Sequence, residues 1–165
     1  EDAAAEALFG VLRELVTGIR TLRSEFTIPP SQYVKVRYET TGEASSDIAA
    51  ALEGTEDVAA MLVRSDDLDL VGKDENLDGS LAVVGRGFTA HVFIKDLIDV
   101  DAAVDRFRKS LEKSKKLIEG KKKKLSNENF ISRAPEDIIA KEKESLAEMI
   151  DAAERSSAYL SSLVG

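Results

Sequence analysis

The stretch VDAAVDRFRKSLEKSKKLIEGKKKKL, residues 100–125, decides the fold, because its apolar and small residues recur at steps of four and three. A second stretch, residues 139–163, has the same repeat. The repeated positions are Val100, Val104, Phe107, Leu111, Ser114, Ile118, Lys121 and Leu125, then Ile139, Glu142, Leu146, Met149, Ala153, Ser156, Leu160 and Leu163. Such steps form a heptad seam, which places one side of a helix against a partner helix. The repeat therefore predicts two helices packed along one seam.

The residue types of the two seams match when the helices run antiparallel. Lys121 then faces Glu142, so the two charged seam positions meet, and bulky Phe107 faces small Ser156. Two unrelated helices would seldom match in this way. The sequence therefore predicts an antiparallel helical hairpin, with a first helix of about residues 99–125. At a rise of about 1.5 Å per residue, this helix is about 40 Å long.

Positive charge is concentrated toward the outer end of this hairpin. The whole chain is acidic, with 23 basic and 31 acidic residues, but residues 106–133 hold eleven basic and three acidic side chains. This segment carries +8, and the rest of the chain carries −16. Lysines on an exposed helix face often serve solubility alone, whereas a long positive arm also suits contact with a phosphate backbone. Both interpretations stay open on charge alone.

The region before the hairpin predicts a helix followed by a small α/β unit. Apolar residues at helical spacing run from Asp2 to about Ser24, and Pro29 and Pro30 prevent the helix from continuing. Strand candidates then follow at YVKVRYE, LDLVG, LAVVG and FTAHVFI, together with an Ala-rich helix interrupted at Gly54. From residues 39 to 78 the composition is strongly acidic, which does not favour nucleic-acid binding by this part alone.

The predicted fold class is α+β: a small α/β unit with a short antiparallel sheet, followed by a long antiparallel coiled coil. We expect three domains, namely a helix at 1–31, an α/β connector at 32–96 and the hairpin at 97–165. Because the chain starts inside a helical pattern without an initiator Met, we also expect it to be a fragment of a longer protein.

No catalytic or metal site is predicted. The chain has no cysteine, and its single histidine, His91, lies in a strand pattern that favours a structural role. The glycines of GRG, residues 85–87, open no helix, so this motif predicts a hairpin turn instead of a phosphate loop. The acidic residues of the middle segment follow no metal-loop spacing. No apolar run of 18 residues is present, so we expect no membrane insertion.

Three segments resemble the C-terminal region of valyl-tRNA synthetases. The tip of the hairpin is similar to a Lys-Leu-Ser-Asn element followed by a Phe and an Ala-Pro pair. The matching residues are Lys124, Leu125, Ser126, Asn127, Phe130, Ala134 and Pro135. The segment IRTLRSEFTIPP is similar to the end of the family's anticodon-binding domain, through Ile19, Arg20, Arg23 and Glu25, with Pro29 and Pro30 following. The segment FIKDLIDVDAAVDRFRKSLEK resembles the family's lead-in to its arm.

The resemblance implies a non-catalytic fragment whose coiled-coil arm lies against the outer corner of tRNA and supports valine attachment. It implies tRNA as the partner, no cofactor in this fragment, ATP in the parent ligase, a cytoplasmic location and a monomer. Lys122, Lys123 and Lys124 lie outside the seam, so we expect no partner for them in the hairpin core. The predicted tRNA contacts are Arg106, Lys109, Lys113, Lys115, Lys116, Lys122, Lys123, Lys124 and Arg133.

A protein-docking or intramolecular clamp without RNA contact is the alternative hypothesis. It predicts an apolar patch outside the seam, for which Ile131, Ile138 and Ile150 are the candidates, and binding that is insensitive to salt. An enzyme in its own right has little support, because no set of catalytic residues stands out. Within the arm, Gly120 is expected to soften the first helix.

Overall fold

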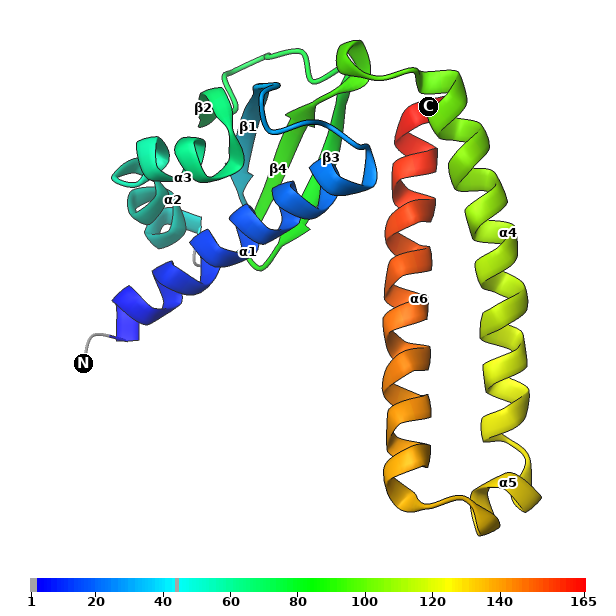
Figure 1. The fold of residues 1–165 in the computed structure, drawn as a ribbon. Coiled ribbons are helices and arrows are strands. Elements are labelled where there is room, and N and C mark those ends of the chain that lie inside the picture. Colours follow the sequence, from blue (N-terminus) through cyan, green and yellow to red (C-terminus); the bar gives the residue numbers. More distant parts are fainter. Residues whose placement is uncertain (1–2, 44) are drawn as a thin grey trace. The chain divides into compact units, whose positions relative to one another are not determined.

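The computed structural model describes residues 3–43 and 45–165, and it divides after Asp99 into two compact units. The first unit is a four-stranded sheet with helices, and the second is a long helical hairpin (Figure 1). The predicted α+β class is therefore confirmed.

The sheet of the first unit is mixed. Its strand order is β2-β1-β4-β3, and β4 pairs antiparallel with both β1 and β3, whereas β1 and β2 are parallel. The sequence predicted antiparallel pairing alone. A parallel pair requires a crossover connection, which is here supplied by the two helices between β1 and β2. The strands are β1 (Val34–Thr40), β2 (Ser65–Leu70), β3 (Ser80–Gly85) and β4 (Phe88–Phe93).

One face of the sheet is covered by helix α1 (Ala3–Glu25) (Figure 1). Alternate residues of β1 and β4 are buried, as a period of two requires. The apolar stripe of α1 packs on this face, and Leu15, Ile19 and Leu22 are fully buried. The predicted helix start, Asp2, lies outside the described residues. Gly18 permits the close approach of α1 to β3, because a Cβ at this position would overlap the side chain of Val83.

The crossover consists of α2 (Ser45–Glu53) and α3 (Glu56–Val63), which are separated at Gly54 as the sequence predicted. Arg64 caps the C-terminal end of α3 and adopts the left-handed conformation, with φ 58° and ψ 53°. The GRG segment forms the predicted turn between β3 and β4, and Gly87 supplies a positive φ of 81° there. A short 3-10 turn, η1 (Lys95–Leu97), follows β4.

The second unit is the predicted antiparallel hairpin. Its helices are α4 (Val100–Leu125), α5 (Glu128–Arg133) and α6 (Glu136–Val164) (Figure 1). Every predicted seam residue of α4 is at least partly buried, whereas its other residues are exposed apart from Ala103. Near the base, the rings of Phe107 and Tyr159 meet edge to face, with centroids 6.0 Å apart. The large residue Phe107 is thus accommodated partly by a second aromatic side chain.

The turn of the hairpin is a short capped helix. Asn127 caps α5, since its side-chain oxygen accepts a hydrogen bond of 3.0 Å from the backbone N–H of Asn129. Helix α6 begins directly after Pro135, and the acidic residues Glu136 and Asp137 occupy its first turn, where they favour the helix dipole. Helix α4 continues without interruption through Gly120.

Candidate nucleic-acid interface

Two rows of basic side chains follow α4. Members of each row recur every seven residues, so each row keeps a constant angle to the seam, which has the same period. At a rise of about 1.5 Å per residue, successive members stand about 10.5 Å apart. All six side chains are exposed. These basic rows are Arg108, Lys115 and Lys122, and beside them Lys109, Lys116 and Lys123.

Helix geometry places the second row on the side of α4 away from α6. Lys109 is two positions beyond the seam residue Phe107, which corresponds to a rotation of about 200° at 3.6 residues per turn. Lys116 also forms an ion pair of 3.3 Å with Glu112, but both side chains are about three-quarters exposed (77% and 73%). An exposed pair of this kind is weak and easily exchanged for another anion. The rows are therefore accessible to a ligand.

Lys124 behaves differently from its two neighbours. Its Nζ lies 3.4 Å from Oε1 of Glu142 and 4.8 Å from the centroid of the Phe130 ring. The prediction that Lys124 has no partner in the hairpin was therefore wrong. Three residues after Lys121, it lies on the same side of α4, so both lysines approach one carboxylate. The hydrogen bond from Lys121, with further help from Lys124, lowers the pKa of Glu142.

The remaining predicted contacts lie outside the rows. Arg106 and Lys113 are exposed on α4, and the guanidinium carbon of Arg106 stands 5.1 Å from the centroid of the Phe107 ring. Arg133 is exposed at the end of α5, on the tip of the hairpin. The structure thus groups five of the nine predicted residues in the basic rows. The sixth member of the rows, Arg108, was not among the predicted contacts, although its seven-residue distance from Lys115 places it in the same row.

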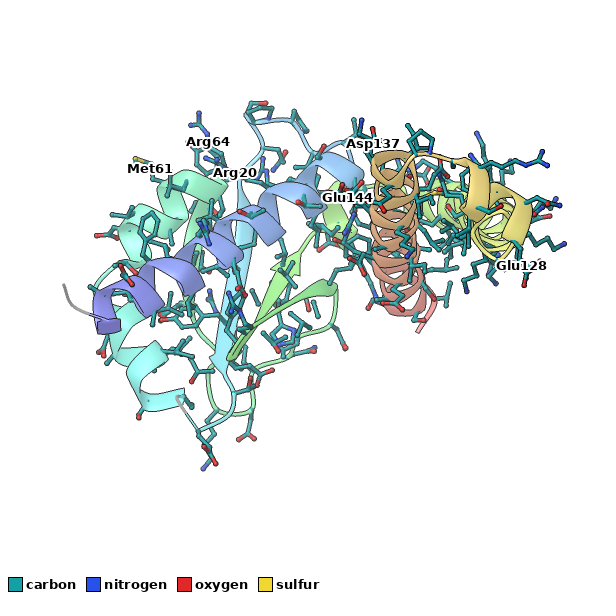
Figure 2. All side chains as sticks on the ribbon, turned by 90° about the horizontal axis from the view of Figure 1, so that it is seen from below. Arg20, Met61, Arg64, Glu128, Asp137 and Glu144 are labelled. Atoms are coloured by element: carbon teal, nitrogen blue, oxygen red, sulfur yellow. The ribbon has the colours of Figure 1, made fainter. Side chains whose placement is uncertain are left out.

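The two long helices of the hairpin differ in charge. Helix α4 contains ten basic and four acidic residues, whereas α6 contains three basic and seven acidic residues. The exposed carboxylates of α6 include Asp137 and Glu144, which are labelled in Figure 2. An extended polyanion would be attracted to α4 and repelled by α6. The charge difference therefore distinguishes the α4 side of the hairpin from the α6 side for any polyanion.

Residues 99–164, which include all of α4, α5 and α6, match the protein family described as the valyl-tRNA synthetase tRNA-binding arm. The whole chain is also similar to valine–tRNA ligases. It is 38% identical over 160 residues to that of Treponema denticola, which covers 96% of the chain and 17% of the relative. The chain belongs to the valyl-tRNA synthetase family. The predicted recognition of a C-terminal fragment of this family is confirmed.

Other valyl-tRNA synthetase relatives cover similar ranges. The valine–tRNA ligase of Borreliella burgdorferi is 35% identical over 136 residues, which are 82% of the chain and 15% of the relative. That of Petrotoga mobilis is 33% identical over 144 residues, which are 87% of the chain and 16% of the relative. The chain therefore spans about a sixth of the length of these relatives.

Among the described residues, no group of three or more His, Cys, Asp or Glu side chains is arranged to hold a metal ion. Within the same residues, no helix is both long enough and apolar enough to cross a membrane.

Proposed function

We propose that the hairpin binds tRNA through the basic rows of α4, as a non-catalytic C-terminal region of a valyl-tRNA synthetase. The observation that carries this proposal is the alignment of six exposed basic side chains in two seven-residue rows. These rows lie within a unit that matches a tRNA-binding-arm family. Lys and Arg side chains that neutralise phosphates release condensed counterions, which supplies binding free energy without sequence recognition.

The contact proposed for the rows is with the backbone at the outer corner of the tRNA. Base edges in the deep major groove of an RNA helix are out of reach of side chains, so a straight helix such as α4 meets phosphates and 2′-hydroxyl groups instead. The arm would then recognise the shape of the tRNA and leave its identity to other contacts. Valine attachment, with ATP, would take place in parts of the parent enzyme beyond this chain.

The test is a titration of the 165-residue chain with valine tRNA, a non-cognate tRNA and duplex DNA at about 50 and 200 mM salt. We expect both tRNAs to bind with similar, salt-sensitive affinities, and DNA to bind more weakly. The double variant Lys122→Gln/Lys123→Gln should reduce the slope of log affinity against log salt by about 1.4 to 1.8, because each lost phosphate contact removes about 0.7 to 0.9.

The matched control is Lys141→Gln/Lys143→Gln, which removes the same charge from exposed positions of α6. This control should leave the salt slope unchanged, since neither residue lies in the basic rows. If both double variants reduce the salt slope by the same amount, overall charge, and not the basic rows, determines binding. An unchanged slope in the α4 variant would overturn the proposal.

The docking hypothesis has one supporting observation. Ile131 and Ile138 are exposed by 44% and 39% near the tip of the hairpin, whereas the third candidate, Ile150, is half-buried. If the tip docks on a protein surface, the variant Ile131→Ser/Ile138→Ser should abolish binding that is insensitive to salt. The tRNA-binding proposal expects this variant to retain its salt slope.

A further inference from the structure

A cavity of about 330 Å³ in the first unit gathers three arginines. It lies where the C-terminal half of α1 passes the end of α3. Arg20, Arg23 and Arg64 line it, together with apolar walls that include Ile28 and Val63. This unit, residues 1–99, is acidic, with nine basic and 19 acidic residues. Three of the nine basic side chains nevertheless converge here, and no carboxylate of a described residue lines the cavity.

Arg23 is used by the fold itself. It is only 6% exposed, and its hydrogen-bond partners among the described residues are all backbone carbonyls. Its Nη1 donates to Val63 and Arg64 at 3.2 and 3.3 Å, and its Nη2 donates to Pro29 and Gln32 at 2.8 and 2.7 Å. These carbonyls accept from the four terminal N–H donors, but no carboxylate of a described residue forms an ion pair with Arg23. Burial, followed by the nearby charge of Arg64, lowers the pKa of Arg23.

Arg20 and Arg64 keep donors that the fold does not use. The Nε of Arg20 donates to the carbonyl of Leu62 at 3.0 Å, which orients the side chain along the end of α3. Among the described residues, neither its terminal nitrogens nor the guanidinium of Arg64 has a hydrogen-bond or ion-pair partner. Both side chains are exposed, and Figure 2 shows them close together where α1 passes α3.

We propose that this cavity binds a phosphate group. Two guanidinium groups offer several N–H donors in fixed planes, and the hydroxyl of Ser24 lies in the same lining. The oxygens of a tetrahedral oxyanion can accept hydrogen bonds from all of these directions at once. A planar carboxylate has only two oxygens and would leave some of the donors without an acceptor. The charge of Arg23, whose terminal N–H groups donate to backbone carbonyls, adds electrostatic attraction, and a bound anion would relieve the repulsion between Arg23 and Arg64.

The phosphate could belong to an RNA strand or be free in solution, because the donors recognise the same group in both. The two sources differ in measurable ways. A strand would also contact surface around the cavity and would bind more tightly than inorganic phosphate. If the natural ligand is the free ion, inorganic phosphate would saturate the site, and an RNA strand would bind no more tightly than phosphate. The cavity lies in the first unit, so the inference does not depend on the basic rows of the hairpin.

The test is NMR titration of the ¹⁵N-labelled full chain with inorganic phosphate, and separately with a short single-stranded RNA, with sodium chloride at matched ionic strength as the blank. The variant is Arg20→Gln/Arg64→Asn. Asn suits the left-handed conformation at position 64, so this change removes the guanidinium without straining the end of α3. The control is Arg13→Gln, an exposed arginine of α1 that does not line this cavity.

We expect saturable shifts in the side-chain N–H signals of Arg20 and Arg64 and in the amides of residues 62–64. The double variant should bind at least about tenfold more weakly, because charge-assisted hydrogen bonds are lost. The Arg13 control should bind normally. Tighter binding of RNA than of phosphate supports a strand as the ligand, and equal binding supports the free ion. Shifts that do not saturate, or that persist in the double variant, would overturn the proposal.

Discussion

Lys121 of α4 and Glu142 of α6 form an ion pair across the hairpin seam, with 2.9 Å between Nζ and Oε2. Their side chains are 25% and 22% exposed, so the pair is partly removed from water. It occupies the position that an apolar pair holds elsewhere along the seam. A slip of the helices by one heptad would place Lys121 opposite Pro135 or Met149 and leave both charges unpaired. The pair therefore specifies register, as single polar positions do in other coiled coils.

Replacement of this pair should show how much it contributes to the stability of the hairpin. The single variant Glu142→Leu should lower the melting temperature, because it leaves the Lys121 ammonium partly buried without its partner. The double variant Lys121→Leu/Glu142→Leu should recover the loss or exceed the original stability. Thermal unfolding of the three proteins, followed by circular dichroism, would measure both effects. A double variant as unstable as the single one would contradict this account.

The hairpin could be predicted in detail because its information is local and repeated. Each heptad position of one helix constrains its partner on the other, and the charged residues Lys121 and Glu142 fix the alignment. The same periodicity locates the basic rows, including Arg108, once steps of seven are followed. The contact of Lys124 with Glu142 was missed, because seam periodicity does not show how far a long flanking side chain reaches.

The first unit was predicted less completely because its contacts join distant segments. The strands and the GRG turn followed from local patterns, but the parallel pairing of β1 with β2 depends on how the crossover helices pack. The structural role of Arg23, which donates to four backbone carbonyls, could not be predicted from the sequence either. Its partners are backbone carbonyls up to 41 residues away, and carbonyls have no side-chain identity that a sequence could reveal.

Arg23 is therefore a sensitive position for the stability of the first unit. The variant Arg23→Leu should lower its free energy of unfolding by about 3 kcal/mol, because buried carbonyls lose charged donors. Arg23→Lys should recover only part of this loss, since an ammonium cannot reproduce the planar fork. Hydrogen exchange of the β1 and β4 amides would measure the change. Arg13→Leu, at an exposed position of α1, should stay within about 0.5 kcal/mol of the original.

Two of the helical glycines, Gly120 and Gly18, should respond in opposite ways to replacement by alanine. A Cβ at Gly120 meets no atom within 4 Å, so Gly120→Ala should stabilise the hairpin by about 0.5 to 1 kcal/mol through helix propensity. A Cβ at Gly18 overlaps Val83, so Gly18→Ala should destabilise the first unit. Urea unfolding, with hydrogen exchange to separate the units, would measure both effects. A destabilised Gly120→Ala variant would indicate that the arm requires local flexibility.

Glu75 should make the stability of the first unit depend on pH. Its carboxylate accepts hydrogen bonds from the N–H of Gly72 at 2.9 Å, Lys35 at 3.0 Å and Arg37 at 2.9 Å. These contacts, led by the backbone N–H of Gly72 and the side chain of Lys35, lower the pKa of Glu75 to about 2. The network lies beside β1 and includes a second ion pair, of 2.8 Å, between Arg37 and Asp67.

Because the folded pKa of Glu75 lies below its unfolded value of about 4.5, its stabilising contribution is fully present above pH 4.5. That contribution is lost progressively as the pH falls toward 2. Glu75→Gln should therefore be less stable than the original protein at pH 7, and the difference between the two should shrink between pH 4.5 and pH 2. Urea unfolding of both proteins across this range would measure the difference directly. If it remains constant down to pH 2, the carboxylate charge of Glu75 is not what stabilises the network.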